Sequence, residues 1–399
     1  MRIALWNASG LDNLGDRLLD TVNRRELSAR LPEASFQTFS PWPSDSLPFV
    51  SIDGEGRWCG ESEFDAIVIG GGALLIGPPF VHPTLQTCYL GPYPDRFRDA
   101  CPVVWNAVCS DGQFVPALAD VWRKYVQSAA ARLTYRSVRN RRTAQLLQEC
   151  GVTDPVQVVP DPVTLFDQPR GSGKPGARRR RIGLALGASS NADAFVAHLT
   201  ADSGGLDRNP AVNVSVPPAI LQDDDERARA AAFTAHVARS FAELAAHADL
   251  EVCAFGAVYG DAATAADVLR VASAHEATLR DADGADALAW IRSLDCLVAS
   301  RLHACILAVV AGTPLVAIDP YYSAVIGTSK VREFMSDTGL LDEYLTRDSW
   351  LEGPISLAEA CDRAIAGRDR MPAIHDALAR PARAHFDALA DVIREKRSS

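Results

Sequence analysis

The chain has 399 residues, and 40 Lys and Arg against 50 Asp and Glu give it a formal net charge of −10 at neutral pH. Hydrophobic residues make up 48% of the sequence and charged residues 23%, which is typical of a globular protein with a sizeable core and excludes disorder as the main state. The acidic balance also argues against a nucleic-acid-binding protein that works by general attraction to phosphates. It leaves small anionic substrates open, because a pocket can be locally positive in an acidic protein.

The cysteines and the apolar segments indicate the setting. No C-x-x-C pair occurs, and no stretch approaches the roughly 18 apolar residues that a membrane span needs. We therefore expect reduced, mostly buried thiols, no membrane span and a cytoplasmic protein. The nine cysteines are at positions 59, 88, 101, 109, 150, 253, 296, 305 and 361.

Short apolar segments alternate with helical patterns over the first 161 residues. Fully apolar strands separated by helices indicate a parallel sheet that is covered on both faces. The expected strands are 3–6, 65–72, 102–106, 133–138 and 156–161, and the expected helices are 16–31, 115–131 and 142–150.

A stretch rich in Pro, Gly, Ser and Arg, residues 168–181, predicts a domain linker, and the alternation resumes after it. The sequence thus predicts two doubly wound, Rossmann-like α/β domains, residues 1–170 and 182–399, joined by a linker at 171–181. They should face each other across a cleft, where such folds bind ligands, and the last helix could pack back on the N-terminal domain. The later strands are expected at 182–187, 251–255, 295–300 and 314–319, and the later helices at 225–248, 262–274, 287–293, 301–310, 331–338, 357–366 and from about 374.

The strongest single candidate site lies at residues 297–308, where an apolar strand ends at Ser300 and a helix starts at once. We expect Ser300 to cap this helix, so that its first N–H groups and the positive end of its dipole point out of the sheet. Arg301 and His303 on the first turn add a fixed cation and a titratable donor, which suits an anion with several oxygens. The alternative is an exposed Arg and a core His at an ordinary helix start. The other histidines stand singly and are interpreted as structural or solvated.

Three further segments follow predicted strands. Asn13 and Gly15 permit a tight turn before the first helix, and Asp16 is interpreted as its cap in preference to a group facing the cleft. The glycines at 70–72 let the backbone approach a ligand closely, but neither segment has a dinucleotide fingerprint or a P-loop. Of the arginines after the strand at 133–138, Arg139 is nearest the strand end and is the candidate for the cleft, the alternative being a solvated surface.

Taken together, these segments resemble the polysaccharide pyruvyl transferase family. They occur in the family's order from residue 13 to residue 340. At 106–111 the chain has Asn-Ala-Val-Cys-Ser-Asp where many relatives carry a glycine-rich segment. The segments that carry the resemblance are Asn-Leu-Gly-Asp-Arg-Leu from 13, Asp-Ala-Ile-Val-Ile-Gly-Gly-Gly from 65, Ser-Val-Arg-Asn from 137, Val-Val-Pro-Asp-Pro from 158, Ser-Arg-Leu-His-Ala-Cys from 300 and Lys-Val-Arg-Glu-Phe-Met from 330.

The resemblance implies a GT-B-like arrangement of the two domains, with phosphoenolpyruvate as the donor and a pyruvate ketal on two hydroxyls of the acceptor as the product. It implies that Arg301, Leu302 and His303 bind the donor, and by position Arg139 as well. The N-terminal domain would then hold the acceptor, which is a sugar, a glycan or a lipid-linked sugar. The alternatives are a glycosyltransferase of the same shape that uses a nucleotide sugar, and a binding protein without turnover.

The residues fit this chemistry. His303 beside the leaving phosphate could donate a proton, and Asp16 could accept one from an acceptor hydroxyl. No metal or other cofactor is expected, because fixed cations can stabilise the phosphate. The remaining residues expected to bind substrate are Asn13, Gly15, Gly71, Gly72 and Lys330.

Overall fold

The computed structural model describes residues 1–7, 13–39, 63–75, 101–110, 119–166, 179–187, 224–256, 265–266, 268–270, 275–276, 284–319, 329–346, 349–350 and 355–398. Most of the predicted linker, residues 171–178, lies outside this part of the chain, as do residues 262–264, 267 and 271–274 of the helix expected at 262–274. Within the described part no helix is both long and apolar enough to cross a membrane.

The first half of the chain forms one parallel sheet. Its strand order is β2-β1-β3-β4-β5-β6, and every neighbouring pair runs parallel. The strands are β1 (Arg2–Trp6), β2 (Ser35–Phe39), β3 (Ala66–Leu75), β4 (Val103–Ser110), β5 (Tyr135–Val138) and β6 (Gln157–Val158), and the helices are α1 (Leu14–Arg30), α3 (Ala119–Ala131), α4 (Arg141–Glu149) and the 3-10 turn η3 (Pro162–Leu165).

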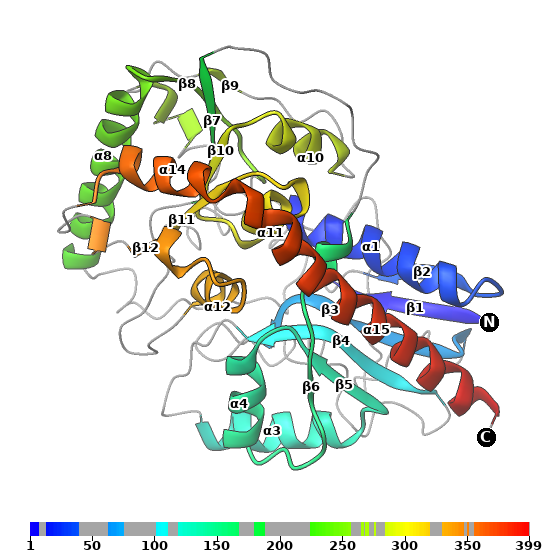
Figure 1. The fold of residues 1–399 in the computed structure, drawn as a ribbon. Helices are drawn as coiled ribbons and strands as arrows, with labels where there is room; N and C mark the ends of the chain where they lie inside the picture. Colours follow the sequence, from blue (N-terminus) through cyan, green and yellow to red (C-terminus); the bar gives the residue numbers. More distant parts are fainter. Residues whose placement is uncertain are drawn as a thin grey trace, which may run out of the picture.

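The second half forms another parallel sheet, with the order β12-β11-β10-β7-β8-β9. Figure 1 shows its strands in the upper part of the molecule and those of the first sheet below. The strands are β7 (Arg180–Ala185), β8 (Ala248–Val252), β9 (His275–Glu276), β10 (Cys296–Ala299), β11 (Leu315–Asp319) and β12 (Tyr344–Thr346), and the helices are α8 (Asp224–Ala245), α10 (Ala285–Arg292), α11 (Leu302–Ala311), α12 (Lys330–Asp337), α14 (Leu357–Ala366) and α15 (Met371–Ser398).

The predicted fold class, two parallel-sheet α/β domains, is confirmed. Three described strands were not predicted, namely β2, β9 and β12. Each of them lies at an edge of its sheet, and β9 and β12 have only two and three residues. An edge strand needs no continuous apolar run, because one side of it is not covered by a neighbouring strand, and so the pattern that marked the central strands is missing.

Alternate residues of each strand pack into different clusters, which arranges the molecule in layers. Along β1, Ile3 and Leu5 belong to an inner cluster, whereas Ala4 and Trp6 belong to an outer one that also holds residues of α3 and α4. The second sheet has its own outer cluster with α8 and α14. The inner cluster takes residues from both sheets, so one continuous core joins the two halves of the chain.

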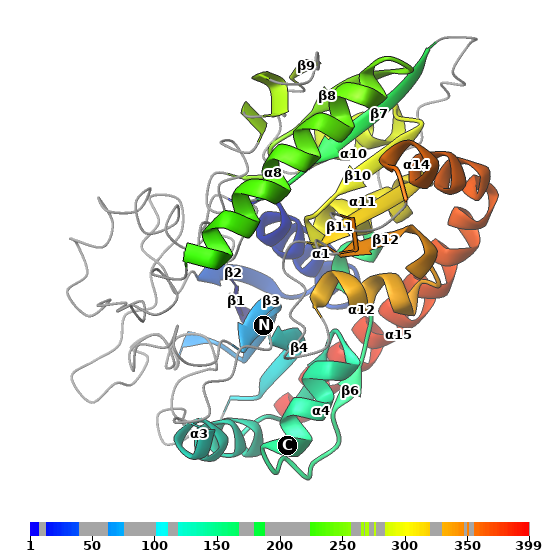
Figure 2. The same cartoon turned by 90° about the vertical axis from the view of Figure 1, so that its left-hand side faces the viewer.

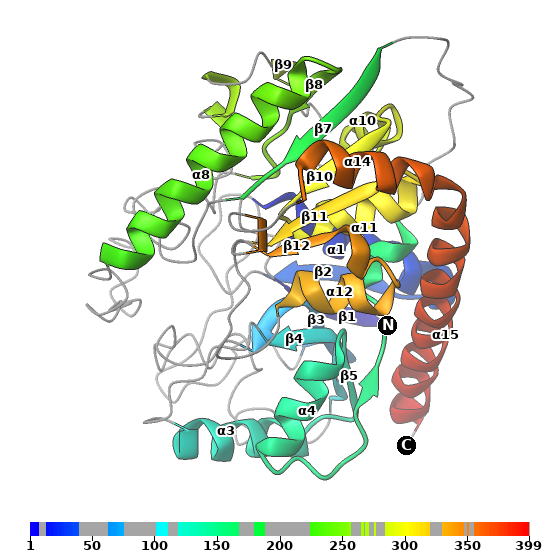
Figure 3. The ribbon, with the colours of Figure 1, turned by 60° about the vertical axis from the view of Figure 1, so that its left-hand side comes forward.

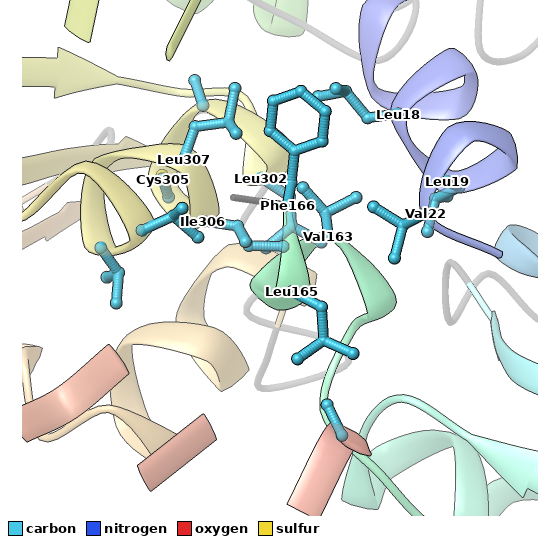
Figure 4. Close-up of a cluster of buried hydrophobic side chains, with 14 of the residues drawn as sticks. Leu18, Leu19, Val22, Val163, Leu165, Phe166, Leu302, Cys305, Ile306 and Leu307 are labelled. Carbon is cyan, nitrogen blue, oxygen red and sulfur yellow. The ribbon is translucent and has the colours of Figure 1, made fainter. Parts of the chain in front are cut away.

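The centre of this inner cluster is η3 and the residue after it. Figure 4 shows Phe166 and its neighbours from η3 between the side chains of α1 and those of α11. Phe166 is 2% exposed. The labelled residues around it are Leu18, Leu19 and Val22 of α1, Val163 and Leu165 of η3, and Leu302, Cys305, Ile306 and Leu307 of α11.

Replacing Phe166 with Ala should therefore destabilise both halves at once. We expect the Phe166→Ala variant to lose about 3–5 kcal/mol of unfolding free energy, because a buried ring leaves a cavity that two domains line. Urea unfolding followed by circular dichroism measures the change. As a control, Val158→Ala removes a side chain that is 46% exposed and should change the stability by less than about 0.5 kcal/mol. Equal stability of the two variants would contradict the role given to Phe166.

The long helix α15 spans the two halves, as Figures 2 and 3 show from two further sides. It packs on α1, η3 and α11. Arg30 of α1 pairs with Asp387 at 2.6 Å. His385 lies on the buried side of α15, where the Tyr135 hydroxyl is 3.1 Å from its Nδ1. Burial and the nearby Arg30 lower the pKa of His385 to about 4.

This lowered pKa predicts a pH dependence of stability. The unfolded chain binds a proton at His385 below about pH 6.5 and the folded chain does so only below about pH 4, so stability from this residue is complete above pH 6.5 and is lost as the pH falls toward 4. Between pH 7.5 and pH 5 the wild type should lose about 2 kcal/mol more than a His385→Gln variant, whose side chain does not titrate. Urea unfolding at the two pH values measures this difference, and parallel losses in the two proteins would refute it.

Candidate active site

The strand orders place two ligand-binding positions opposite each other. In the first sheet the chain reverses direction across the sheet between β1 and β3, and in the second between β7 and β10. Open α/β sheets bind ligands at the carboxyl ends of strands at such switch points. Gly71 and Gly72 lie in the second half of β3, and Arg301 and His303 follow β10 directly. These four predicted residues therefore stand on or just after strands that flank the switch points of the two sheets.

The connection from β10 to α11 differs from the expectation in the residue at the N-cap. Helix α11 begins at Leu302 with Arg301 at the N-cap position, and no side chain caps it. The expectation that Ser300 caps this helix is wrong. Its hydroxyl instead accepts a hydrogen bond from Gly187 N–H at 2.7 Å, which joins the ends of β7 and β10. Leu302 packs into the inner cluster, and this fixes the first turn on which Arg301 and His303 stand.

The His303 ring reaches across to the first half of the chain. A Cβ built on Gly15 would lie 1.8 Å from Nδ1 of His303, so only glycine leaves room for the ring at this point of α1. On its other side, His303 Nε2 is 3.6 Å from Oδ2 of Asp161. The side chain of His303 is only 13% exposed, and Nε2 makes no hydrogen bond.

The start of α1 makes hydrogen bonds both among its own residues and to the second half of the chain. Asn13 is the N-cap, because its Oδ1 accepts from Gly15 N–H at 3.1 Å. The interpretation of Asp16 as the cap is therefore wrong: Asp16 lies on the first turn, where its Oδ2 accepts from Asn13 Nδ2 at 2.7 Å. Leu14 N–H donates to the carbonyl of Phe255 at 2.9 Å, just beyond β8. This bond fixes the α1 start against the second sheet.

Asp16 is buried, and burial raises the pKa of its carboxyl group although nearby cations oppose this. A Cβ on Gly72, whose φ is +104°, would lie 3.3 Å from Asp16 Oδ1, so this glycine backbone packs closely on the carboxyl group. The basic side chains that lower the pKa of Asp16 against its burial are His303, Arg139, Lys330 and Arg301, in order of effect. Basic residues of both halves thus lie near enough to Asp16 to lower its pKa.

Arg139 pairs with Asp161, which the sequence did not predict as a site residue. Arg139 follows β5, and its Nη1 donates to Oδ2 of Asp161 at 2.8 Å with both side chains buried. Asp161 Oδ1 also accepts from Val163 N–H at 2.9 Å. Burial would raise the pKa of Asp161, but His303, Arg139 and the Val163 N–H hold it well below its usual range. The sequence contained a signal for Asp161, an Asp between two prolines at a strand end, but no pattern showed which side chain it would meet.

Lys330 begins α12, and a buried acid fixes this start. Ser329 caps the helix by accepting from Arg332 N–H at 3.0 Å, and its own hydroxyl donates to Asp319. Asp319 is fully buried at the end of β11 and also accepts from the Tyr344 hydroxyl at 2.7 Å. The start of α12, where Lys330 stands, is therefore anchored to the end of β11.

The chemical character of the site follows from its two carboxyl groups. Asp16 has a raised pKa, whereas that of Asp161 is lowered. Two carboxyl groups whose surroundings shift their pKa values in opposite directions suit different tasks. One can exchange protons, and the other remains a fixed charge. Within the described residues, no group of three or more His, Cys, Asp or Glu is placed to hold a metal ion.

The fixed charge of Asp161 should be important for stability. An Asp161→Asn variant leaves Arg139 buried without its anionic partner, and we expect it to lose about 3–5 kcal/mol. Glu149→Gln, which breaks the exposed pair with Arg142, is the matched control and should cost less than about 1 kcal/mol. Denaturant unfolding of both variants tests this, and a loss in Asp161→Asn no larger than in the control would contradict it.

Comparisons with known proteins agree with the sequence motifs. The family model for polysaccharide pyruvyl transferase matches residues 13–320. A search of curated proteins gave no match. Among solved structures, the chain is similar to ADP-heptose LPS heptosyltransferase II of E. coli (14% identity, 92% of this chain and 100% of that one, TM-score 0.40) and to the glycosyltransferase SnogD of Streptomyces nogalater (13%, 98% and 99%, 0.42). TM-scores this low carry no argument about activity.

Proposed function

The chain belongs to the polysaccharide pyruvyl transferase family, and we propose that it moves the pyruvyl group of phosphoenolpyruvate onto two hydroxyls of a sugar or glycan acceptor to form a ketal. The observation that supports this donor is that basic side chains of the two halves meet at one place, because Arg139 Nη1 is 2.8 Å and His303 Nε2 is 3.6 Å from Oδ2 of Asp161. Phosphoenolpyruvate carries a carboxylate and a phosphate. Arginine forks and an uncapped helix start provide separate anchors for two such groups.

The three fixed cations come from different places in the fold, which supports binding of a ligand with two anionic ends. Arg139 follows β5 of the first sheet, Arg301 follows β10 of the second, and Lys330 stands at the start of α12. The ionised Asp161 is already paired with Arg139 and balances one of these charges. Guanidinium and ammonium groups that come from both halves suit an anionic substrate with several oxygens.

In the first step we assign the role of proton donor to His303. It gives its proton to the methylene carbon of phosphoenolpyruvate, and the adjacent carbon becomes electron-poor. One acceptor hydroxyl forms a C–O bond to that carbon and loses its proton to Asp16. Burial raises the pKa of Asp16 against the opposing effect of the nearby basic groups. This suits Asp16 for the exchange, because a raised pKa brings a carboxylate closer to the basicity of a useful general base.

In the second step the bond from that carbon to the phosphate oxygen breaks, and phosphate leaves with the electron pair. The departing phosphate takes the proton from Asp16. The second acceptor hydroxyl then attacks the same carbon and gives its proton to His303, which had lost its own in the first step, so that phosphoenolpyruvate and a diol give a ketal and inorganic phosphate. Arg301 and Lys330 stabilise the leaving phosphate, and we propose no metal or other cofactor. Asn13, Gly15, Gly71, Gly72 and Leu302 shape the space in which the two substrates meet.

We assign the acceptor to the N-terminal half, residues 1–170, and the donor to the C-terminal half, residues 182–399, with 171–181 as the linker. The acceptor class is a sugar, a glycan or a lipid-linked sugar. We also propose a cytoplasmic location. The described thiols of Cys150, Cys296, Cys305 and Cys361 are free and buried, which supports a reducing compartment.

Ligand binding tests the donor directly. Phosphoenolpyruvate at 100 times its dissociation constant should stabilise the protein by about 2.7 kcal/mol in a thermal-shift assay, and UDP-glucose or GDP-mannose should not. Phosphate release with methyl glycosides of glucose, galactose and mannose as probe acceptors should fall by about 10²-fold or more in Arg301→Ala and in His303→Ala. Gly15→Ala should reduce it similarly, because its methyl group displaces His303.

The matched control is Ser28→Ala, an exposed position on the same helix as Gly15, which should leave both binding and release unchanged. Stabilisation by a nucleotide sugar but not by phosphoenolpyruvate would replace the proposed reaction by glycosyl transfer. Phosphate release that persists in both Arg301→Ala and His303→Ala would show that the reaction takes place elsewhere.

A further inference from the structure

A buried chain of hydrogen bonds runs from the C-terminal helix to the glycines of β3. His385 of α15 has Nδ1 3.1 Å from the Tyr135 hydroxyl and Nε2 2.7 Å from Asn106 Oδ1. Asn106 Nδ2 donates to Asn23 Oδ1 at 2.9 Å, and Asn23 Nδ2 donates to the carbonyl of Gly70 at 3.3 Å. We call these five residues the relay. It links α15, β4 and α1 to the backbone beside the candidate active site.

The hydrogen bonds of the relay all run in one direction. Because Asn106 Oδ1 can only accept, His385 Nε2 must carry a hydrogen. The pKa of His385, lowered to about 4, keeps the ring neutral near pH 7, so Nδ1 accepts from the Tyr135 hydroxyl. Each of the Asn106 and Asn23 amides accepts through its oxygen and donates through its nitrogen, so the same donor-to-acceptor direction continues to the Gly70 carbonyl. The direction of each hydrogen bond therefore follows from the one before it.

Strand β4 is distorted where it supplies Asn106. The next residue, Ala107, has φ of +52°, and the register of β4 against β5 shifts between Trp105 and Val108. A left-handed residue other than glycine costs about 1–3 kcal/mol and persists only where its surroundings hold it. Here Ser137 does so, because its hydroxyl accepts from Ala107 N–H at 2.9 Å. Such irregularities often aim a side chain near an active site.

Asn106 occupies a buried strand position of the kind that an apolar residue usually takes. It is fully buried, and its neighbour two residues earlier, Val104, belongs to the inner hydrophobic cluster. A buried amide is costly unless it is hydrogen-bonded, and Asn106 meets this need through His385 and Asn23. A polar network among buried residues fixes one arrangement when all its members are satisfied. The relay is therefore suited to hold a backbone segment in place.

The segment that it holds faces Asp16. Asn23 and Asp16 stand seven residues apart on α1, two turns along the same helix, so the relay and the carboxyl group share one support. Gly71 has φ of +79° and packs on Leu19 of the same helix. Gly72, two residues after the relay's last contact, faces Asp16, because a Cβ built on it would lie 3.3 Å from Asp16 Oδ1.

We propose that His385, Asn106 and Asn23 are positioning residues that hold the glycines of β3 against Asp16, so that α15 sets the geometry at which an acceptor hydroxyl loses its proton. This inference rests on the proposed function, since it concerns the acceptor side of that reaction. The relay ends at the backbone beside Asp16 and not at Arg139 or His303. Its loss should therefore affect turnover more than the binding of phosphoenolpyruvate.

Two substitutions of His385 test the proposal in the full chain. In His385→Gln the amide nitrogen can reach the position of Nε2 and donate to Asn106, whereas His385→Leu has no donor. We expect His385→Leu to lower kcat about tenfold with the methyl glycosides as probe acceptors, because a small displacement at a reacting group is enough for this. Its dissociation constant for phosphoenolpyruvate should stay within about twofold of wild type, and His385→Gln should stay within about twofold in both.

Hydrogen–deuterium exchange gives a readout that does not need the reaction. In His385→Leu, the peptide that spans residues 66–75 should exchange about tenfold faster than in wild type, and in His385→Gln it should not. Asn23→Ala, which removes the last link from the other side, should behave like His385→Leu and serves if the latter does not fold.

Several outcomes would overturn the proposal. These are unchanged exchange of residues 66–75 in both His385→Leu and Asn23→Ala, phosphoenolpyruvate affinity that falls as much as turnover, or His385→Gln as impaired as His385→Leu. If wild type itself releases no phosphate with any probe, the proposed function fails, and the exchange result still decides whether the relay holds the glycines.

Discussion

The carboxylate of Asp161 holds together side chains that come from the two halves of the chain. It pairs with Arg139 of the first half at 2.8 Å and lies 3.6 Å from His303 of the second; Asp161 and Arg139 are buried, and the His303 side chain is 13% exposed. A buried charge is stable only when it is paired, so each of these residues constrains the position of the others. The same aspartate starts η3, whose apolar residues fill the space between α1 and α11. One residue thus links the polar site to the core beneath it.

That core decides how the two halves meet. The inner cluster takes alternate residues from both sheets, so the switch points of the two sheets are held at fixed positions relative to each other. Helix α15 adds a second connection, because it packs on α1 and α11 at once and sends His385 into the first half. The result is a candidate site to which the first half contributes Asp16, Arg139 and Asp161 and the second half contributes His303.

The local features of the fold could be read from the sequence because they depend on neighbouring residues. Central strands are apolar on both faces, and the predicted segments at 65–72, 182–187 and 295–300 correspond to β3, β7 and β10. Edge strands lack this pattern, which is why β2 and β12 were missed. Caps were less predictable: Asn13 and Arg301 occupy the N-cap positions that we had given to Asp16 and Ser300, because long-range hydrogen bonds decide where a helix starts.

The sequence by itself determined the fold class and the family, because both follow from local patterns and motifs, and it predicted Arg139, Arg301, His303 and Lys330 as site residues from the motifs in which they stand. Only the tertiary structure decided that Asp161 pairs with Arg139, that Gly15 makes room for His303, and that His385 reaches Asn106. These contacts join positions from 22 to 288 residues apart, as 161 − 139, 303 − 15 and 385 − 106 show. Local patterns carry no information about such pairs, since only the packing of the two sheets brings them together.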